Sequence, residues 1–295
     1  MTIEIVEFNN GHLSAVCELL NKGSREQYEF IPFDEERVLS QIKRRHLKIL
    51  VAKENGTISG LIASHSHENS EEDITWIATS EGHDRKTVED TLLSALEKHV
   101  NPQTLITMID EGSPRIPEWI SRGFMLQPGF QRMSAKLTGS VPVPMVDADT
   151  KLRNLGPDEE EQLIEAVNKG FGWKRLESGD LETWKSEDPP FTEEWIQVAE
   201  VDQRIVSVVV PKPDTDANRY LHIRRGYLGP AATLPEFRGK HLATALTARS
   251  MNLLFEKGMD SARLGTSEKN VSSIALLSSL GFKVDSVRKI LQKKL

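Results

Sequence analysis

The same order of strand-like and helix-like segments runs twice along this chain, once on each side of a short connector. The connector, residues 139–149 (GSVPVPMVDAD), combines glycine, serine and two prolines, a composition typical of an extended link between domains. The length of 295 residues suits two domains of about 150 residues each. We therefore predict a first domain at residues 1–138 and a second at residues 150–295.

Each half alternates short apolar strands with amphipathic helices. Asn55-Gly56 is the strongest hairpin signal in the chain, and Asp202-Gln203 marks a turn between two strands of the second half. Other strands are predicted at residues 3–8, 73–78, 104–109, 150–155, 226–234, 262–267 and 282–294 and as a pair after Phe124, and helices at residues 11–23, 86–100, 158–172, 239–256 and 270–280 and before Arg122-Gly123. This order predicts two α/β (α+β) domains, each a mixed, mostly antiparallel sheet flanked by helices.

The composition argues against several classes of partner. A formal net charge of −7 is unlike that of a nucleic-acid binder, and no stretch approaches the roughly 20 apolar residues of a membrane span. The first residues alternate like a strand and do not resemble a signal peptide, and Cys17 is the only cysteine. We expect a cytoplasmic protein, a monomer or a homodimer, with no nucleic-acid or membrane partner and no metal site.

The stretch LPEFRGKHLATAL, residues 234–246, places a basic glycine turn between a strand and a helix. The first amides of a helix have no partner within the helix, and the helix dipole adds positive potential there, so such a turn attracts phosphate. Gly239 lets the backbone approach a ligand closely, and Arg238 and Lys240 add positive charge. The alternative is an ordinary strand-to-helix turn with solvated charges.

These residues resemble the acetyl-CoA-binding signature of the GNAT superfamily of N-acetyltransferases, in which Arg or Gln is followed by two residues, Gly, one residue, and Gly or Ala. Arg238 takes the first position, His241 stands at the first glycine, and Ala243 takes the last. A second block, NVSSIALLSSLGF, supplies Asn270, Ser273 and the Gly281-Phe282 pair at the spacing the family shows. The two blocks cover residues 226–284.

The resemblance implies transfer of an acetyl group from acetyl-CoA to a primary amine of a small molecule, or of a protein or peptide, through the second domain. The thioester would lie beside a strand whose backbone N–H near Thr233 or Leu234 polarises its carbonyl. The positions it assigns to acetyl-CoA binding are Ala232, Thr233, Leu234, Arg238, Gly239, Lys240, His241, Leu242, Ala243, Thr244, Asn270 and Ser273.

His241 departs from the signature. The signature works through main-chain N–H donors, and we expect a negative φ in the first helical turn, where glycine is not required. The side chain is then expected to cap the helix or face solvent. A histidine that contacts phosphate or acts as a base is the less favoured reading, because a helix N-terminus disfavours the charged imidazole.

The catalytic residues are not identified by the sequence. An alkyl amine with a pKa of about 10.4 must lose a proton before it attacks, which calls for a base or a water chain. The candidates are Glu236 in a surface turn, Glu268 in a helix first turn, and His222 and Tyr227 on strand faces. Many members of the family protonate the departing thiolate with a tyrosine at the place where this chain has Leu277, which suggests a changed or slower mechanism.

The first half resembles a degenerate domain of the same fold. Arg85 matches Arg238, but a lysine follows it, and Glu89 and Asp90 add negative charge near the start of the helix, where they would compete with phosphate. The layout resembles that of tandem members of the mycothiol synthase type. We expect a structural domain that replaces a partner subunit, without a second active site.

Acceptor specificity is expected from residues 171–195, which are rich in aromatic side chains that either line the substrate or anchor a loop: Trp173, Trp184, Phe191 and Trp195. An alternative function is that of a non-catalytic acyl-CoA-binding or scaffold protein. Leu277, His241 and the lack of an evident base favour that alternative. Acetyl-CoA binding without thiol release would support it.

Overall fold

The computed structural model describes residues 2–23, 27–67 and 70–295. The chain forms two compact units, and each is described by itself. Unit 1 contains Met1–Phe130 and Ser286–Leu295, and unit 2 contains Gln131–Asp285. The described residues include no helix with the length and apolar character needed to span a membrane.

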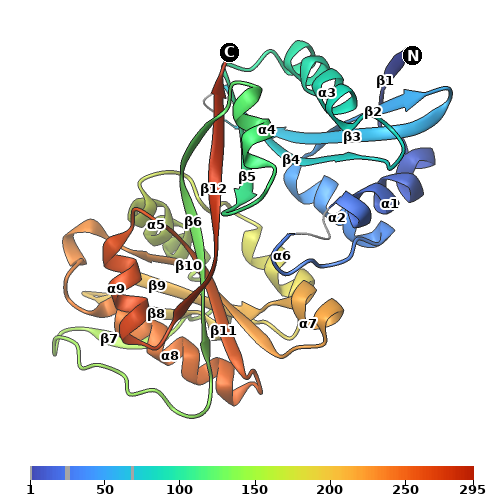
Figure 1. Cartoon of the computed structure of the whole chain (residues 1–295). Coiled ribbons are helices and arrows are strands. Elements are labelled where there is room, and N and C mark those ends of the chain that lie inside the picture. Colours follow the sequence, from blue (N-terminus) through green and yellow to red (C-terminus); the bar gives the residue numbers. More distant parts are fainter. Residues whose placement is uncertain (1, 24–26, 68–69) are drawn as a thin grey trace. The chain divides into compact units, whose positions relative to one another are not determined.

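Unit 1 is a sheet with helices on both faces (Figure 1). Its elements are β1 (Ile3–Glu7), α1 (Leu13–Gly23), α2 (Glu35–Arg45), β2 (Lys48–Glu54), β3 (Thr57–Ser66), β4 (Glu71–Thr79), α3 (Arg85–Val100), β5 (Thr104–Asp110), α4 (Ile116–Ser121) and the first half of β6 (Met125–Lys136). The last strand of this sheet is β12 (Lys283–Lys294), from the C-terminal end of the chain. The strands follow the order β1-β2-β3-β4-β5-β12, and all these pairs are antiparallel except β4–β5.

The two faces of this sheet carry separate cores because side chains alternate along each strand. On β2, Ile49 and Val51 pack with α1 and α2, whereas Leu50 and Ala52 pack with α3 and α4.

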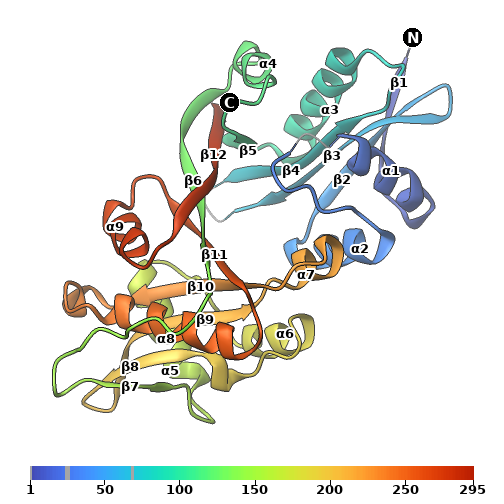
Figure 2. The ribbon, with the colours of Figure 1, turned by 60° about the horizontal axis from the view of Figure 1, so that its bottom comes forward.

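Unit 2 repeats the arrangement (Figure 2). Its elements are β7 (Lys151–Asn154), α5 (Glu160–Phe171), α6 (Asp180–Glu187), β8 (Gln197–Val201), β9 (Arg204–Pro213), α7 (Thr215–Leu221), β10 (Arg225–Thr233), α8 (Leu242–Glu256), β11 (Ser261–Ser267), α9 (Val271–Ser279) and the start of β12 (Lys283–Lys294). The sheet order is β11-β10-β9-β8-β7, antiparallel except for β10–β11. The predicted fold class is confirmed.

The predicted turns are confirmed, and some element assignments are corrected. Asn55-Gly56 joins β2 to β3 with positive φ at both residues, and Asp202-Gln203 does the same between β8 and β9. The strand pair expected after Phe124 is instead one long strand, β6. The sequence analysis did not predict three short helices, α2, α6 and α7.

The ends of the two units cross the predicted domain limits. Residues 286–295 of β12, which follow the second half in sequence, belong to unit 1, where they pair with β5. Residues 131–136 of β6 belong to unit 2. The predicted connector has no helix or strand, and Val141 bonds through both its backbone groups to the side chain of Asn252 (2.6 and 2.9 Å). The connector therefore packs as part of unit 2.

Candidate active site

Strands β10 and β11 separate soon after they begin. They pair in parallel only from Arg225 to Tyr227, opposite Ser261 to Arg263. One extra residue on β10 between Leu228 and Ala231 forms a β-bulge against β9, which bends the strand. Beyond Tyr227, no strand among the described residues pairs with the edge of β10 that faces β11, so the backbone groups of this edge are available to a ligand that lies along it.

The turn after β10 differs from the prediction. A 3-10 turn at Pro235–Phe237 is followed by Arg238–His241, and α8 begins only at Leu242, three residues later than predicted. His241 has a φ of +60°, so the expected negative φ is wrong. Glycine is the residue best suited to this left-handed conformation, which histidine tolerates at some cost. The positive φ at this position explains why the signature that the sequence resembles has glycine where this chain has His241.

The turn before α8 leaves backbone N–H groups open to a ligand. Gly239 has a φ of +81° and His241 a φ of +60°, with Lys240 between them at negative φ. Alternation of this kind turns successive N–H groups toward one side, where an anion can bind. Among the described residues no side chain caps α8, and His241 is exposed and makes no capping bond. The first amides of α8 thus remain open to a phosphate.

The two predicted cations at the turn already have partners. The Arg238 guanidinium donates to the carbonyl of Gly170 (2.8 Å) and to that of Thr233 (3.3 Å). Lys240 Nζ lies 3.4 Å from the carboxylate of Asp147 in the connector. Arg238 therefore ties the turn to the end of α5 and to β10, in addition to the charge that it brings.

The backbone at the end of β10 separates the two predicted thioester donors. The N–H of Leu234 donates to the carbonyl of Val206 on β9 (2.9 Å) and is not available. In an antiparallel pair the N–H groups of successive residues point to opposite sides, so the N–H of Thr233 points away from β9 toward the open edge. Of the two, Thr233 keeps a donor for a carbonyl oxygen.

Gly170 of α5 lies against this donor. A Cβ at Gly170 would stand 2.9 Å from the Ala232 Cβ and 3.2 Å from the Thr233 nitrogen. Such distances are closer than ordinary packing allows, so only glycine fits without a shift. The sequence analysis missed this residue because the contact joins elements more than 60 positions apart.

The remaining predicted acetyl-CoA positions divide between backbone and capping roles. Leu242 is buried in the core of unit 2, while Ala243 and Thr244 are half-buried in the first turn of α8. Asn270 caps α9, because its side chain accepts a bond from the amide of Ser273 (3.1 Å). Leu277, in the place of the family's tyrosine, is buried and apolar.

The four candidate proton-transfer residues lie on different elements. Glu236 is exposed in the turn after β10 and pairs with Arg204 (3.4 Å). Glu268 is half-buried in the turn after β11, before α9 and not in its first turn. His222 is exposed at the C-terminal end of α7, so its predicted place on a strand face is wrong. Tyr227 lies on β10.

Tyr227 occupies the point where β10 and β11 part. It is the last residue of β10 that pairs with β11, where it stands opposite Arg263, and its hydroxyl lies against Gly265 of β11. Burial raises the pKa of the Tyr227 phenol, so the group stays protonated at neutral pH. A phenol in this state donates a proton or a hydrogen bond and is a poor base.

The aromatic residues of the predicted acceptor segment have two different fates. Phe191 and Trp195 are buried in the core of unit 2, which matches the reading as loop anchors. Trp173 is 57% exposed and meets the ring of Phe171 edge to face, with ring centroids 5.7 Å apart. Phe171 follows Gly170 directly, and Trp173 lies two residues further along the chain.

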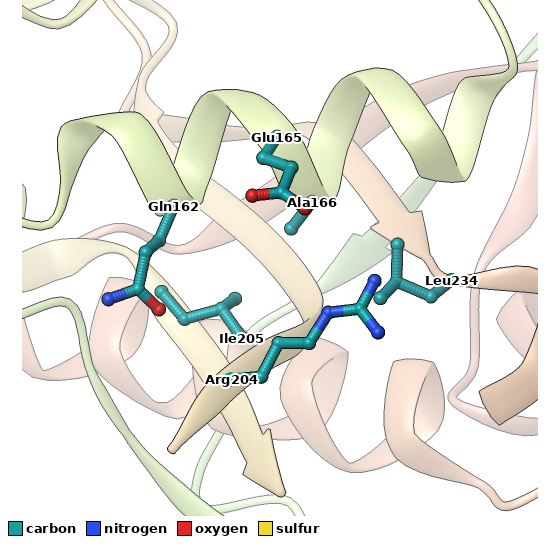
Figure 3. Close-up of a pocket in the computed structure, with 6 residues that line it drawn as sticks. All are labelled: Gln162, Glu165, Ala166, Arg204, Ile205 and Leu234. Atoms are coloured by element: carbon teal, nitrogen blue, oxygen red, sulfur yellow. The ribbon is translucent and has the colours of Figure 1, made fainter. Parts of the chain in front are cut away.

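A shallow hollow of about 190 Å³ lies between α5, β9 and the end of β10 (Figure 3). It is lined by Gln162, Glu165, Ala166, Arg204, Ile205 and Leu234. Even with the space that is open to solvent included, this volume is below the roughly 300 Å³ at which small-molecule pockets begin. It therefore carries no ligand assignment.

Unit 1 has the same strand geometry but a filled helix start. β4 and β5 pair in parallel over four residues only, Glu71 to Ile74, and β4 also carries one extra residue, Thr75. In contrast to α8, helix α3 is capped: the Asp84 side chain accepts from the amide of Lys86 (3.2 Å). A carboxylate of the chain itself therefore occupies the place where α8 is open.

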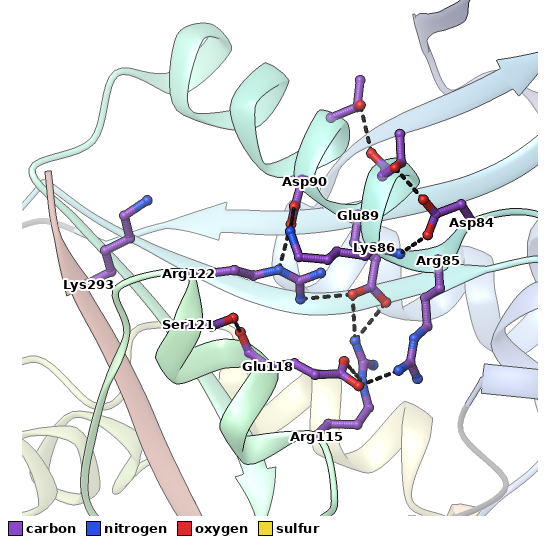
Figure 4. A network of polar contacts seen from close by, with 12 residues as sticks. Asp84, Arg85, Lys86, Glu89, Asp90, Arg115, Glu118, Ser121, Arg122 and Lys293 are labelled. Atoms are coloured by element: carbon purple, nitrogen blue, oxygen red, sulfur yellow. Dashed lines mark hydrogen bonds and ion pairs between the residues drawn. The ribbon is translucent and has the colours of Figure 1, made fainter. Parts of the chain in front are cut away.

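Ion pairs occupy the surroundings of the start of α3 and link it to α4 (Figure 4). Glu89 of α3 is 1% exposed and binds the guanidinium of Arg115 (2.6 and 2.7 Å) and that of Arg122 (2.9 Å). Arg85 pairs with Glu118 of α4. The predicted competition between carboxylates and phosphate thus takes a more specific form, in which arginines of the unit already satisfy the carboxylates.

Comparison with known proteins agrees with this geometry. Residues 159–282 match the model of the acetyltransferase (GNAT) family. A curated relative, N-alpha-acetyltransferase 30 of Schizosaccharomyces pombe, is 30% identical over 95 residues, which are 31% of this chain and 61% of the relative's length. The chain thus spans about three fifths of that relative.

Solved structures match almost the whole chain in fold. A GCN5-related N-acetyltransferase from Sphaerobacter thermophilus has a TM-score of 0.75 at 16% identity and covers 99% of this chain and 95% of its own. A tandem GNAT protein from the clavulanic acid biosynthesis pathway has a TM-score of 0.73 at 15% identity, covering 99% and 98%.

The chain has the fold of GNAT proteins, and the second of its two units holds the amide-lined turn. More particularly, residues 159–282 form an acetyltransferase domain of the GNAT family. The resemblance to that family is confirmed, while the likeness to the mycothiol synthase layout stays a prediction.

Proposed function

We propose that this chain is an N-acetyltransferase that moves an acetyl group from acetyl-CoA to a primary amine through residues 150–295. The observation that carries the proposal is the uncapped turn at Arg238–Leu242, placed at the open end of the parting strands β10 and β11. The family match over the same residues supports it. Unit 1, in which Asp84 fills the equivalent helix start, serves as a structural domain in this proposal.

In this site the amides of residues 239–244 hold the pyrophosphate, and the open edge of β10 holds the arm that carries the thioester. The N–H of Thr233 is the fixed donor for the thioester carbonyl. Asn270 and Ser273 set the start of α9 beside this cleft and contribute through its capped first turn. Acetyl-CoA enters as a co-substrate.

Tyr227 is the residue that we assign to the departing thiolate. Its phenol lies at the closed end of the cleft and stays protonated because burial raises its pKa. A hydrogen bond from this group stabilises the developing thiolate, a role that buried Leu277 cannot fill. Replacement by phenylalanine is expected to lower kcat at least tenfold while the KM for acetyl-CoA stays within about threefold.

The attacking amine is proposed to lose its proton to water. Glu236 and His222 are both exposed, and Glu236 is paired with Arg204. A rate limited by the neutral fraction of an amine with pKa of about 10.4 rises tenfold per pH unit between about pH 7 and 9. A plateau with an apparent pKa below 8 would instead identify an enzyme base among the four candidates.

The acceptor is proposed to rest against Phe171 and Trp173. The curated relative is named an N-alpha-acetyltransferase, which supports an alpha-amine such as a peptide N-terminus as the acceptor. An exposed aromatic pair also suits a small-molecule amine. We propose a cytoplasmic protein, as a monomer or a homodimer, with no nucleic-acid or membrane partner.

Calorimetry with acetyl-CoA, followed by a thiol-release assay over small amines and short peptides, tests the proposal. Arg238→Glu is expected to weaken acetyl-CoA binding at least tenfold, about 1.4 kcal/mol. Arg85→Glu, at the matching position of unit 1, is expected to leave binding unchanged. The reverse result would assign the site to unit 1, and binding without thiol release from any amine would favour the acyl-CoA-binding alternative.

A further inference from the structure

A hairpin in unit 1 gathers two histidines and an aspartate on one face. His65 of β3 stands directly opposite Asp73 of β4 in the antiparallel register, and the amide of His67 donates to the carbonyl of Glu71 (2.8 Å), which continues that register. Residues two apart on a strand share a face. His65, His67 and Asp73 therefore project from the same side of the hairpin (β3 and β4 in Figure 1).

Contacts on the opposite face hold this orientation. Glu72 is completely buried and accepts bonds from the hydroxyls of Ser64 (2.5 Å) and Ser66 (2.7 Å). A slip of one residue would expose Glu72 and bury the histidine face, so the register is strongly specified. The backbone register therefore keeps the three residues on one face of the hairpin.

We propose that His65, His67 and Asp73 bind a divalent late transition metal ion, with zinc as the preferred ion. One ligand atom from each residue lies within 4.8 Å of the others, and His67 Nε2 is 4.0 Å from the Asp73 carboxylate. Zinc bonds of about 2.0–2.1 Å in a tetrahedral site place ligand atoms about 3.4 Å apart. Small side-chain rotations therefore suffice to close the site, and a water molecule completes four ligands.

The surroundings support and also limit this site. The hydroxyl of Thr75, the extra residue of the β4 bulge, lies 3.2 Å from His65 Nδ1 and fixes that ring, which leaves Nε2 for a metal. Imidazoles with one carboxylate are a donor set that suits zinc rather than magnesium or calcium. The guanidinium groups of Arg45 and Arg288 interact electrostatically with Asp73, and their positive charge opposes a cation.

Titration of untagged, full-length protein, stripped with EDTA and dialysed, tests the site directly. Isothermal calorimetry with zinc chloride is expected to show one ion per chain, and cobalt(II) to give the visible bands of a tetrahedral complex. Neither readout depends on acetyl transfer. Wild-type protein that binds no zinc at a one-to-one ratio overturns the proposal.

Matched variants locate the ion. His67→Ala, at a side chain that is 45% exposed and safe to truncate, is expected to weaken zinc binding at least tenfold. Thr75→Val is expected to weaken it about tenfold through the lost ring contact. Arg45→Ala is expected to tighten it.

The control is His99→Ala. His99 also pairs with a carboxylate, that of Glu7 at 3.9 Å, and lies outside the histidine cluster. This variant should bind zinc as the wild type does. Equal zinc affinity in His67→Ala and His99→Ala would show that the metal binds elsewhere and would refute the assignment.

Discussion

Replacing His241 by glycine is expected to stabilise unit 2 and to leave acetyl-CoA binding unchanged. His241 has a φ of +60°, and the left-handed conformation costs a residue with a side chain about 1–2 kcal/mol. Glycine avoids this cost but loses about 0.5–1 kcal/mol more backbone entropy on folding. The net gain is therefore about 0–1.5 kcal/mol. Acetyl-CoA binding should not change, because the amide that the proposed phosphate site uses is the same in both proteins.

The opposite change at Gly239 provides the matched control. Its φ is +81°, and a Cβ there would meet no atom within 4 Å, so Gly239→Ala introduces the backbone cost without a steric clash. We expect this variant to be destabilised by about 1 kcal/mol. The two variants therefore measure the same conformational penalty with opposite signs.

Thermal unfolding and calorimetry with acetyl-CoA measure both effects. In a unit of this size 1 kcal/mol corresponds to a shift of about 2–4 °C in Tm, and affinity should stay within about threefold for His241→Gly. A tenfold loss of affinity in His241→Gly would show that the imidazole itself contacts the ligand. A Tm that does not change in either variant would contradict the left-handed turn and the argument built on it.

Three further changes test other parts of the molecule. Glu89→Gln should destabilise unit 1 by about 3 kcal/mol in urea unfolding, because it leaves buried arginine charge uncompensated, whereas Glu118→Gln at the surface should cost less than about 1 kcal/mol. Gly170→Ala should lower kcat at least tenfold in the thiol-release assay without unfolding the protein, since the new methyl group crowds the β10 amide; full activity would contradict that packing. Hydrogen bonds from Arg153 lower the pKa of the Glu159 carboxyl in the folded protein. The stabilisation by this ion pair is therefore complete above the unfolded carboxyl pKa of about 4.3 and is lost as pH falls through the lower folded pKa. Between about pH 5 and 3, the urea midpoint of Glu159→Gln should fall less than that of the wild type, and parallel curves would refute the coupling.

Local chemistry in the sequence was enough to predict the turns between neighbouring strands and to find the glycine turn before α8. Asn55-Gly56 and Asp202-Gln203 favour tight turns through their own backbone preferences, which no distant contact had to supply. The glycine turn before α8 was likewise located from residues that are adjacent in sequence. The α/β architecture followed because the alternation of strands and helices is a property of each segment.

Other features depend on contacts that a single segment does not encode. The positive φ of His241 depends on where α8 begins, which is at the buried residue Leu242. The short distance between Gly170 and Thr233 joins two elements that lie far apart in the sequence. The pairing of His65 with Asp73 requires the hairpin register, including its bulge. Short helices such as α7, which has one buried residue, lack the periodic apolar face from which a helix can be predicted.

The placement of β12 also determines where the chain can be divided into fragments. Leu291, fully buried, completes the core of unit 1 from the far end of the polypeptide, and Met133 contributes to the core of unit 2 from the first half of the sequence. A fragment that ends or begins at residues 139–149 would leave each half without a strand that it borrows from the other. The two fragments on either side of residues 139–149 are therefore expected to fold only when they are produced together. Neither fragment should fold as an independent domain when it is expressed alone.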